Sequence, residues 1–246
     1  MIISDKISAG YGGKTVIKDI SLQAEGGQLI VLLGPNGCGK STLLKTMVGI
    51  LTPVTGHIEI NEKQLLGKAR AKEMAYLSQT RFAAPSMTVR DVIELGRVPH
   101  RGRLEKISEV GQAAIKNAME KTQVTDFVDR PLSELSGGEQ ARVLLARALA
   151  VDAPILLADE PIAALDPFYQ LSMMDILKAE AARGKLVIAA LHDLALANQF
   201  ADQIWLMSAG EIKYSGIPKD VLNSDNLETV FGIKKPAAGF HILSRS

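Results

Sequence analysis

An apolar run followed by a glycine-rich octapeptide constrains this chain more than any other feature of its sequence. Residues 29–33 have no polar alternation, which predicts a parallel strand covered on both faces. The run leads directly into Gly34-Pro35-Asn36-Gly37-Cys38-Gly39-Lys40-Ser41, which matches G-x-x-x-x-G-K-[ST]. With a helix expected from Lys40 to about Ile50, the pattern predicts a strand, a phosphate-binding loop and a helix in succession.

The residue types of this octapeptide suit a polyphosphate. Glycines let the backbone wrap the phosphates with its N–H groups, and the helix N-terminus adds partial positive charge. Lys40 offers a charge to the β- and γ-phosphates, and Ser41 offers a hydroxyl to Mg²⁺. A turn that only caps a helix requires neither side chain. We therefore predict a site for a nucleoside triphosphate with Mg²⁺, formed by residues 34–41 and the following Thr42.

A second apolar run, residues 155–158, ends in Asp159-Glu160-Pro161. Standing alone, an acidic strand end is typical of a solvent-facing edge. Downstream of a phosphate loop, the two acids can divide the chemistry, because successive strand residues point to opposite sides. We expect Asp159 to face Mg²⁺ through its water shell and Glu160 to polarise a water aimed at the γ-phosphate.

A third motif, Leu135-Ser136-Gly137-Gly138-Glu139, precedes a strongly periodic helix. Ser136 and Glu139 have the S-x-x-E spacing of a capping box, so the motif could be only a helix start. Two glycines also permit close backbone approach at an electropositive helix end. The site is therefore suited to a second set of phosphate oxygens.

Strands alternate with helices along most of the chain, which predicts an α/β sheet. The first two strands, joined through Gly12-Gly13, are expected to form an antiparallel edge. Between about Thr88 and Ala150 the apolar residues recur at helical spacing without a strand, which predicts a helical insertion. The expected strands are 2–9, 15–24, 29–33, 57–60, 74–78, 155–158, 186–191 and 204–207, with later helices at 167–183 and 193–200.

Composition excludes several classes of protein. A chain of 246 residues, 47% of them hydrophobic, is expected to fold as a compact unit. Its net charge of +1 argues against a protein that coats nucleic acid or an anionic membrane. The single Cys and the opening MIISDKISAG favour the cytosol, and charges at Arg147, Asp152 and Asp159 interrupt the apolar stretches well short of a membrane-spanning length.

The combination of LSGGE, the phosphate loop and LLADEP resembles an ABC ATPase, and the resemblance covers roughly residues 2–216. It implies an α/β, RecA-like P-loop core with an antiparallel β subdomain and a helical insertion. A single domain is expected over residues 1–231, with core and β subdomain at about 1–87 and 151–216, the helical signature subdomain at about 88–150, and a tail at 232–246. The resemblance also implies a head-to-tail homodimer, in which Ser136, Gly137, Gly138 and Glu139 of one subunit close over ATP held by the other.

Four further positions match the family one at a time. Tyr11 matches the aromatic that stacks on adenine, and Gln79 matches the glutamine that touches Mg²⁺ and the catalytic water. Asp166 matches the loop that crosses between subunits, although Asp before Pro167 is also an ordinary N-cap. His192 matches the histidine that contacts the γ-phosphate. We expect Glu160, Gln79 and His192 to serve catalysis, and Ser41, Gln79 and Asp159 to hold Mg²⁺.

Two positions depart from the family pattern. Ala163 stands where the family often has Ser, so a cross-subunit hydrogen bond from that hydroxyl is absent. Ala141 stands where a longer polar residue is common after the signature. Neither departure removes a group needed for the chemistry.

The segment Thr88-Val89-Arg90-Asp91-Val92-Ile93-Glu94-Leu95-Gly96-Arg97-Val98-Pro99-His100 resembles the ATPases of siderophore, haem and vitamin B12 importers, in which LGR-x-P is frequent. It also fits an amphipathic helix that begins near Thr88 and ends before Pro99. The resemblance implies transmembrane permease subunits, an extracytoplasmic binding protein as an indirect partner, and a location on the cytoplasmic face of the membrane. We expect residues 79–100, including Leu95 and Arg97, to form the docking surface for the permease.

Other functions remain open at this stage. The chain could power another ABC importer, for a metal ion or an oxyanion. An ABC ATPase that acts on nucleic acid or ribosomes typically carries a coiled-coil insert or two ATPase halves, whereas this chain has one set of motifs and no basic arm. We therefore expect no nucleic acid partner. A small P-loop kinase or GTPase is opposed by LSGGE and by the lack of an N-K-x-D motif.

Overall fold

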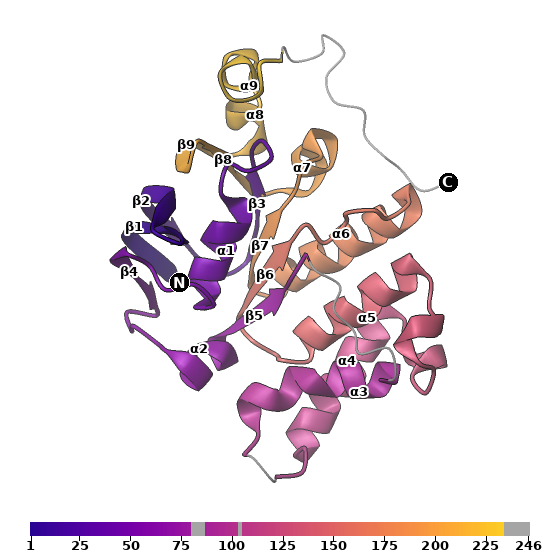
Figure 1. Cartoon of the computed structure of the whole chain (residues 1–246). Helices are drawn as coiled ribbons and strands as arrows, with labels where there is room; N and C mark the ends of the chain where they lie inside the picture. The colour runs from indigo at the N-terminus through magenta and orange to yellow at the C-terminus, as the bar shows by residue number, and fades with distance from the viewer. Residues whose placement is uncertain (80–86, 103–104, 234–246) are drawn as a thin grey trace.

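A computed structural model describes residues 1–79, 87–102 and 105–233, and its central element is a six-stranded sheet (Figure 1). Five neighbouring strands are parallel, and the last, β9, pairs antiparallel with β8. In sheet order the strands are β5 (Met74–Leu77), β6 (Ile155–Asp159), β7 (Leu186–Ala190), β3 (Gln28–Leu33), β8 (Gln203–Ser208) and β9 (Glu211–Gly216). The predicted α/β class is therefore confirmed.

A separate antiparallel sheet has the order β2 (Lys14–Ala24), β1 (Ile2–Tyr11) and β4 (Thr55–Ile60). The register pairs Tyr11 with Lys14 across the turn at Gly12-Gly13, as the two glycines predicted. Both glycines have positive φ, a conformation that costs glycine little. In Figure 1 this sheet lies on the side of the central sheet that carries α1 (Lys40–Val48).

The strand β3 shows why its sequence lacks polar alternation. Leu29, Val31 and Leu33 belong to one buried cluster, which includes residues of α5 (Gly137–Leu149) and α6 (Pro167–Ala182). Ile30 and Leu32 belong to a second cluster, which includes α1 and the antiparallel sheet. Because side chains alternate between the faces of a strand and both faces are covered, every residue of the run is apolar.

The expected helical insertion is present and contains no strand among its described residues. It consists of α3 (Val89–Glu94), the 3₁₀ helix η1 (Leu95–His100), α4 (Glu109–Thr122), two further 3₁₀ turns (Thr125–Phe127 and Leu132–Glu134) and α5. Thr88 and Asp91 form a capping box at the start of α3, so the predicted helix start is confirmed. The α-helix ends before Pro99, but helical backbone continues through Pro99 as the 3₁₀ helix η1.

Several elements were missed by the sequence analysis. They are β9, α2 (Gly67–Glu73), α8 (Pro218–Val221) and α9 (Ser224–Phe231). The helices expected at 167–183 and 193–200 are present as α6 and α7 (Leu194–Phe200). The helix α2 gave no apolar periodicity because Arg70 is its only buried residue. Residues 80–86 of the expected docking surface and 234–246 of the expected tail lie outside the described residues. Over the described ranges, every helix is too short or too polar to span a bilayer.

Candidate active site

The residues predicted to bind phosphate and Mg²⁺ and to serve catalysis meet at one edge of the central sheet. The phosphate loop follows β3, Gln79 follows β5, Asp159 ends β6 and His192 follows β7. These four strands are parallel neighbours, so their carboxyl ends lie along the same edge. In open α/β sheets this edge is where ligands bind.

The phosphate loop has the backbone that its glycines permit. Gly37 and Gly39 both have positive φ, and Gly39 is the N-cap of α1. The Lys40 ammonium is buried and donates to the carbonyls of Gly34 at 2.7 Å and Pro35 at 3.2 Å. Burial lowers the pKa of Lys40, while the charges of neighbouring acids, including Glu160, oppose that shift. The cation therefore lies within the loop and is held by two of its backbone carbonyls.

Cys38 differs from the rest of the loop because its thiol points inward. The side chain is buried in the cluster that includes Ile30 and α1, and burial raises its pKa. Its carbonyl accepts from Gly210 N at 3.0 Å, which ties the loop to the turn between β8 and β9. A contact between Cys38 and a phosphate would therefore use the backbone and not the thiol.

Ser41 and Asp159 are directly joined. Ser41 Oγ lies 2.9 Å from Asp159 Oδ1, and the hydroxyl of Tyr76 donates to Asp159 Oδ2 at 3.1 Å. Asp159 is buried, which raises its pKa, while the two hydrogen bonds oppose the rise. Burial and the charge of Asp159 likewise raise the pKa of Tyr76. Two hard oxygen ligands side by side fit the coordination preferences of Mg²⁺.

Glu160, Gln79 and His192 form a second polar group. Gln79 Nε2 donates to one carboxylate oxygen of Glu160 at 2.6 Å, and His192 Nε2 contacts the other. Glu160 has a φ of 51°, a left-handed conformation that costs a non-glycine residue about 1 kcal/mol or more. Its N–H donates to Ala190 O of β7 at 3.1 Å, which holds the turn against the sheet. The three side chains predicted to serve catalysis therefore converge.

Two adjoining hollows surround these groups. One has a volume of about 270 Å³ and the other about 560 Å³, and both are lined by Asn36, Gly37, Ser41, Glu160 and His192. The smaller hollow is also lined by residues of the antiparallel sheet, Tyr11 and Val16, and the larger one by Gln79. Tyr11 is 50% exposed, so its ring is open to a planar ligand.

The signature residues are locally well formed but do not line these hollows. Ser136 and Glu139 make the predicted capping box, with Ser136 N donating to the Glu139 carboxylate at 2.8 Å. Gly138 lies against the Tyr169 ring, where an added Cβ would lie 2.7 Å from a ring carbon. Asp166 Oδ1 accepts from Tyr169 N at 3.1 Å, so its N-cap role is confirmed.

One predicted surface residue is placed wrongly by the sequence analysis. Arg97 is buried and donates to main-chain carbonyls at the end of α5, so it is not part of an exposed docking surface. Leu95 and Val98 of the same segment are 45% and 55% exposed. The segment therefore has a buried face and an exposed face. Its helical periodicity alone did not show which residues lie on which face.

Tyr76 is the polar residue that the sequence analysis missed. It lies on β5 opposite Leu157 of β6, and this parallel register brings its hydroxyl to Asp159. A tyrosine inside an apolar strand is ordinary packing until the neighbouring strand is known. The sequence offered one signal, its position three residues before Gln79. Only the tertiary structure shows that β5 pairs with β6.

Comparison with known proteins gives one family. The family model of the ABC transporter matches residues 17–163. The hemin import ATP-binding protein of Rhodococcus jostii (strain RHA1) is 40% identical over 96% of this chain and 83% of its own length. The iron(3+)-hydroxamate import ATP-binding protein of Bacillus subtilis (strain 168) is 34% identical over 94% of this chain and 87% of its own.

A solved structure agrees with the fold. The dimeric structure of a bacterial ABC transporter cassette superposes with a TM-score of 0.78 at 28% identity, covering 89% of this chain and 99% of that one. The sheet order and the helical insertion therefore belong to the fold of a known ABC cassette. This chain belongs to the ABC transporter family and is one of its ATP-binding, ATP-hydrolysing domains.

Proposed function

We propose that this chain powers an ABC importer for metal chelates of the iron-siderophore, haem or cobalamin type. The observation that carries the proposal is the match over almost the whole chain to ATP-binding proteins named for hemin and iron-hydroxamate import. The LGR-x-P pattern at residues 95–100, LGRVPH, supports the same proposal and lies beyond the groups needed to hold a nucleotide. An importer for another metal ion or an oxyanion is the alternative within the same family.

The phosphate loop and Asp159 hold the nucleotide and its metal in this proposal. Backbone N–H groups of residues 36–42 and the Lys40 ammonium bind the β- and γ-phosphates. Ser41 and Asp159 hold Mg²⁺, Asp159 through a water, and Gln79 completes that side of the site. The metal, when bound, neutralises charge on the phosphates. Tyr11 stacks on the adenine.

Glu160 is the proposed general base. Its carboxylate orients and deprotonates the water that attacks the γ-phosphate. Gln79 and His192 already contact the two carboxylate oxygens, which fixes the direction of the base. A bound γ-phosphate would give the His192 ring nitrogen a second oxygen partner, so the histidine links the base to the substrate.

The signature is proposed to act on the nucleotide of a second copy. Ser136 and the following glycines do not line the hollows beside their own phosphate loop. They form an electropositive helix end at which Ser136 and Gly137 are exposed, and this exposed pair suits phosphate oxygens supplied from outside the chain. In a head-to-tail homodimer, the phosphate loop of one copy and the signature of the other would bind the same nucleotide. The bacterial ABC cassette that was solved as a dimer supports this arrangement.

The permease is proposed to dock on the exposed face of η1. Leu95 and Val98 place two large apolar side chains on the surface of the helical insertion. Docking there would hold the chain at the cytoplasmic face of the membrane, and the extracytoplasmic binding protein would act only through the permease.

Reconstitution tests this function directly. The chain is combined in liposomes with its permease and binding protein, and uptake of a labelled ferric siderophore, haem or cobalamin is measured with ATP. We expect uptake of one chelate class and stimulation of ATP hydrolysis. Replacing Gly137 with Trp should leave ATP binding by the monomer intact and stop dimerisation, hydrolysis and uptake. Uptake of only a free metal ion or oxyanion would support the alternative importer, and co-purification with ribosomes would contradict both.

A further inference from the structure

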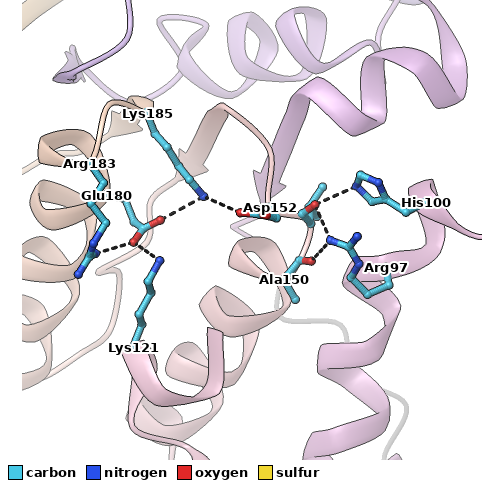
Figure 2. Close-up of polar contacts among 9 residues, drawn as sticks. Arg97, His100, Lys121, Ala150, Asp152, Glu180, Arg183 and Lys185 are labelled. Atoms are coloured by element: carbon cyan, nitrogen blue, oxygen red, sulfur yellow. Dashed lines mark hydrogen bonds and ion pairs between the residues drawn. The ribbon is translucent and has the colours of Figure 1, made fainter. Parts of the chain in front are cut away.

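The segment η1 has two faces with different surroundings. Leu95 and Val98 point to solvent, whereas Gly96 and Arg97 are buried against the rest of the helical insertion. In Figure 2, Arg97 and His100 lie together on one side of η1 and point toward the residues that follow α5. The buried face is therefore directed at the C-terminal end of the helix that begins with the signature.

Gly96 brings the two backbones into direct contact. A Cβ added at this glycine would lie 2.3 Å from the carbonyl oxygen of Arg147 in α5 and 3.0 Å from the Ala150 side chain. No real side chain tolerates the first distance, because the obstacle is a backbone atom of a packed helix. The glycine is needed for η1 to lie on α5.

Arg97 and His100 then bind the end of that helix. Arg97 donates from one terminal nitrogen to Ala150 O at 2.8 Å and Val151 O at 2.9 Å. His100 Nε2 donates to the same Val151 carbonyl at 2.9 Å. Carbonyls at a helix end lack partners within the helix, and a cation there also interacts favourably with the helix dipole. Burial, and then the charge of Arg97, lower the pKa of His100, so its ring stays neutral beside the guanidinium.

The other end of α5 carries the signature. The helix runs from Gly137 to Leu149, and its 13 residues span about 20 Å. Ser136 caps its N-terminus and Ala150 its C-terminus. A helix this short is stiff, so a displacement of its C-terminal end moves the signature as well.

A separate polar cluster holds the chain just beyond α5 to the core. Asp152 lies 3.7 Å from Lys185, and Lys185 pairs in turn with the buried carboxylate of Glu180 (Figure 2). The turn at 150–152 therefore contacts η1 on one side and Lys185, which lies between α6 and β7, on the other.

We infer that Arg97 and His100 are positioning residues that couple the permease-docking segment to the signature. The inference rests on the proposed function, since it requires a permease on Leu95 and Val98. The exposed side chains contact the permease, and Gly96 allows η1 to lie directly on α5. Arg97 and His100 then join η1 to the end of α5 by hydrogen bonds. A shift of η1 then moves α5 and its Ser136 end as one body, without any contact between the permease and the nucleotide.

The test separates coupling from folding and from catalysis. The variants are Arg97→Lys, which keeps the charge but not the fork of donors, and His100→Leu, which removes one bond and leaves Arg97 in place. Arg90→Lys is the matched control, because the Arg90 guanidinium of α3 pairs at 3.0 Å with exposed Asp129, a partner outside α5. For each variant we would measure thermal stability, Mg-ATP affinity and basal hydrolysis by the isolated subunit, then stimulation of hydrolysis in the reconstituted importer.

We expect ATP affinity and basal hydrolysis of both variants to stay within about twofold of wild type, because the altered groups are remote from the nucleotide. Stimulation by the membrane subunits should fall about two- to thirtyfold, the range for residues that carry coupling between sites. Arg90→Lys should retain full stimulation. If all three variants kept full stimulation, the inference would be overturned and the importer assignment would stand. A wild-type chain that no permease stimulates would instead overturn the proposed function. If Arg97→Lys lost stability and ATP binding together, and His100→Leu kept full stimulation, the contact would be structural only and the inference would fail.

Discussion

Two glutamates of this chain, Glu160 and Glu180, each have several polar partners but very different surroundings. Glu160 retains 16% exposure of its side chain and contacts Gln79 and His192. Glu180 is fully buried and is paired with Lys121 at 2.7 Å, Arg183 at 2.8 Å and Lys185 at 3.1 Å (Figure 2). One carboxylate is held by an amide and an imidazole at the edge of a hollow, and the other by full positive charges inside the protein.

The difference shows what makes a carboxylate available for chemistry. A base must accept a proton from water, so strong permanent ion pairs would oppose its function. Burial by itself raises the pKa of Glu180, but the hydrogen bond from Lys121 and the charge of Lys185 outweigh it and hold the pKa below its ordinary value. Glu180 is therefore fixed as an anion that joins α4, α6 and Lys185 before β7, whereas Glu160 is held by an amide and an imidazole.

The largest expected effect comes from Glu160→Gln. The amide keeps the size and the hydrogen bonding but removes the base, so turnover should fall by about a hundredfold or more while ATP still binds. A trapped ATP-bound dimer should accumulate, visible by size-exclusion chromatography with Mg-ATP. Thermal stability should stay near that of wild type. Near-normal turnover in the purified variant would sink the assignment of Glu160 as the base.

Glu180→Gln should have the opposite profile. It leaves Lys121 and Lys185 without their buried counter-charge, so the free energy of unfolding should drop by about 3 kcal/mol, as measured by denaturant titration. Turnover per folded molecule should be close to wild type. If this variant lost turnover at unchanged stability, the separation between the two glutamates would be wrong.

The same residue predicts a dependence of stability on pH. Because the folded pKa of Glu180 lies below its ordinary value of 4.5, its contribution to stability is present above that value and is lost as the pH falls through the folded pKa. Wild type should therefore lose stability more steeply than Glu180→Gln below about pH 4.5. Parallel acid unfolding curves for the two proteins would argue against the shift.

Tyr76→Phe tests the hydrogen bond to Asp159 at the ATP site. It removes only the hydroxyl that donates to Asp159 Oδ2, a loss of about 1 kcal/mol, so Mg-ATP affinity should weaken by about fivefold. Binding of a fluorescent ATP analogue should change in the presence of Mg²⁺ and not in its absence. An equal loss without metal would assign Tyr76 to general packing of β5 against β6.

The smallest effect is expected for Arg183→Met. Arg183 contacts Glu180 three residues away, but its side chain is 56% exposed, so this pair should contribute less than about 0.5 kcal/mol. Lys121→Met should cost more, because Lys121 is mostly buried and joins α4 to α6. Equal losses in the two variants would show that charge alone, and not the bridge between elements, stabilises this cluster.

The sequence by itself determined the parts of this protein that are local. The octapeptide with Lys40 and Ser41, the apolar strand before it, the acids ending β6 and the capping boxes at Thr88 and Ser136 could all be read from spacing, because each depends on residues within a few positions of one another. Gln79 and His192 were found only through a family resemblance, since a polar residue after a strand has no meaning until its neighbouring strands are known.

Only the tertiary structure decided which distant residues meet. Tyr76 reaches Asp159 because β5 pairs with β6, and Glu180 meets Lys121 because the C-terminal ends of α4 and α6 come close together. Arg97 was expected at the surface because LGR-x-P resembles a segment of importer ATPases that is placed to dock a permease, yet the close approach of η1 to α5 at Gly96 buries it. The physical reason is the same in each case: burial and ion pairing depend on what packs opposite a residue, and strand order and helix contacts set that partner across long stretches of chain.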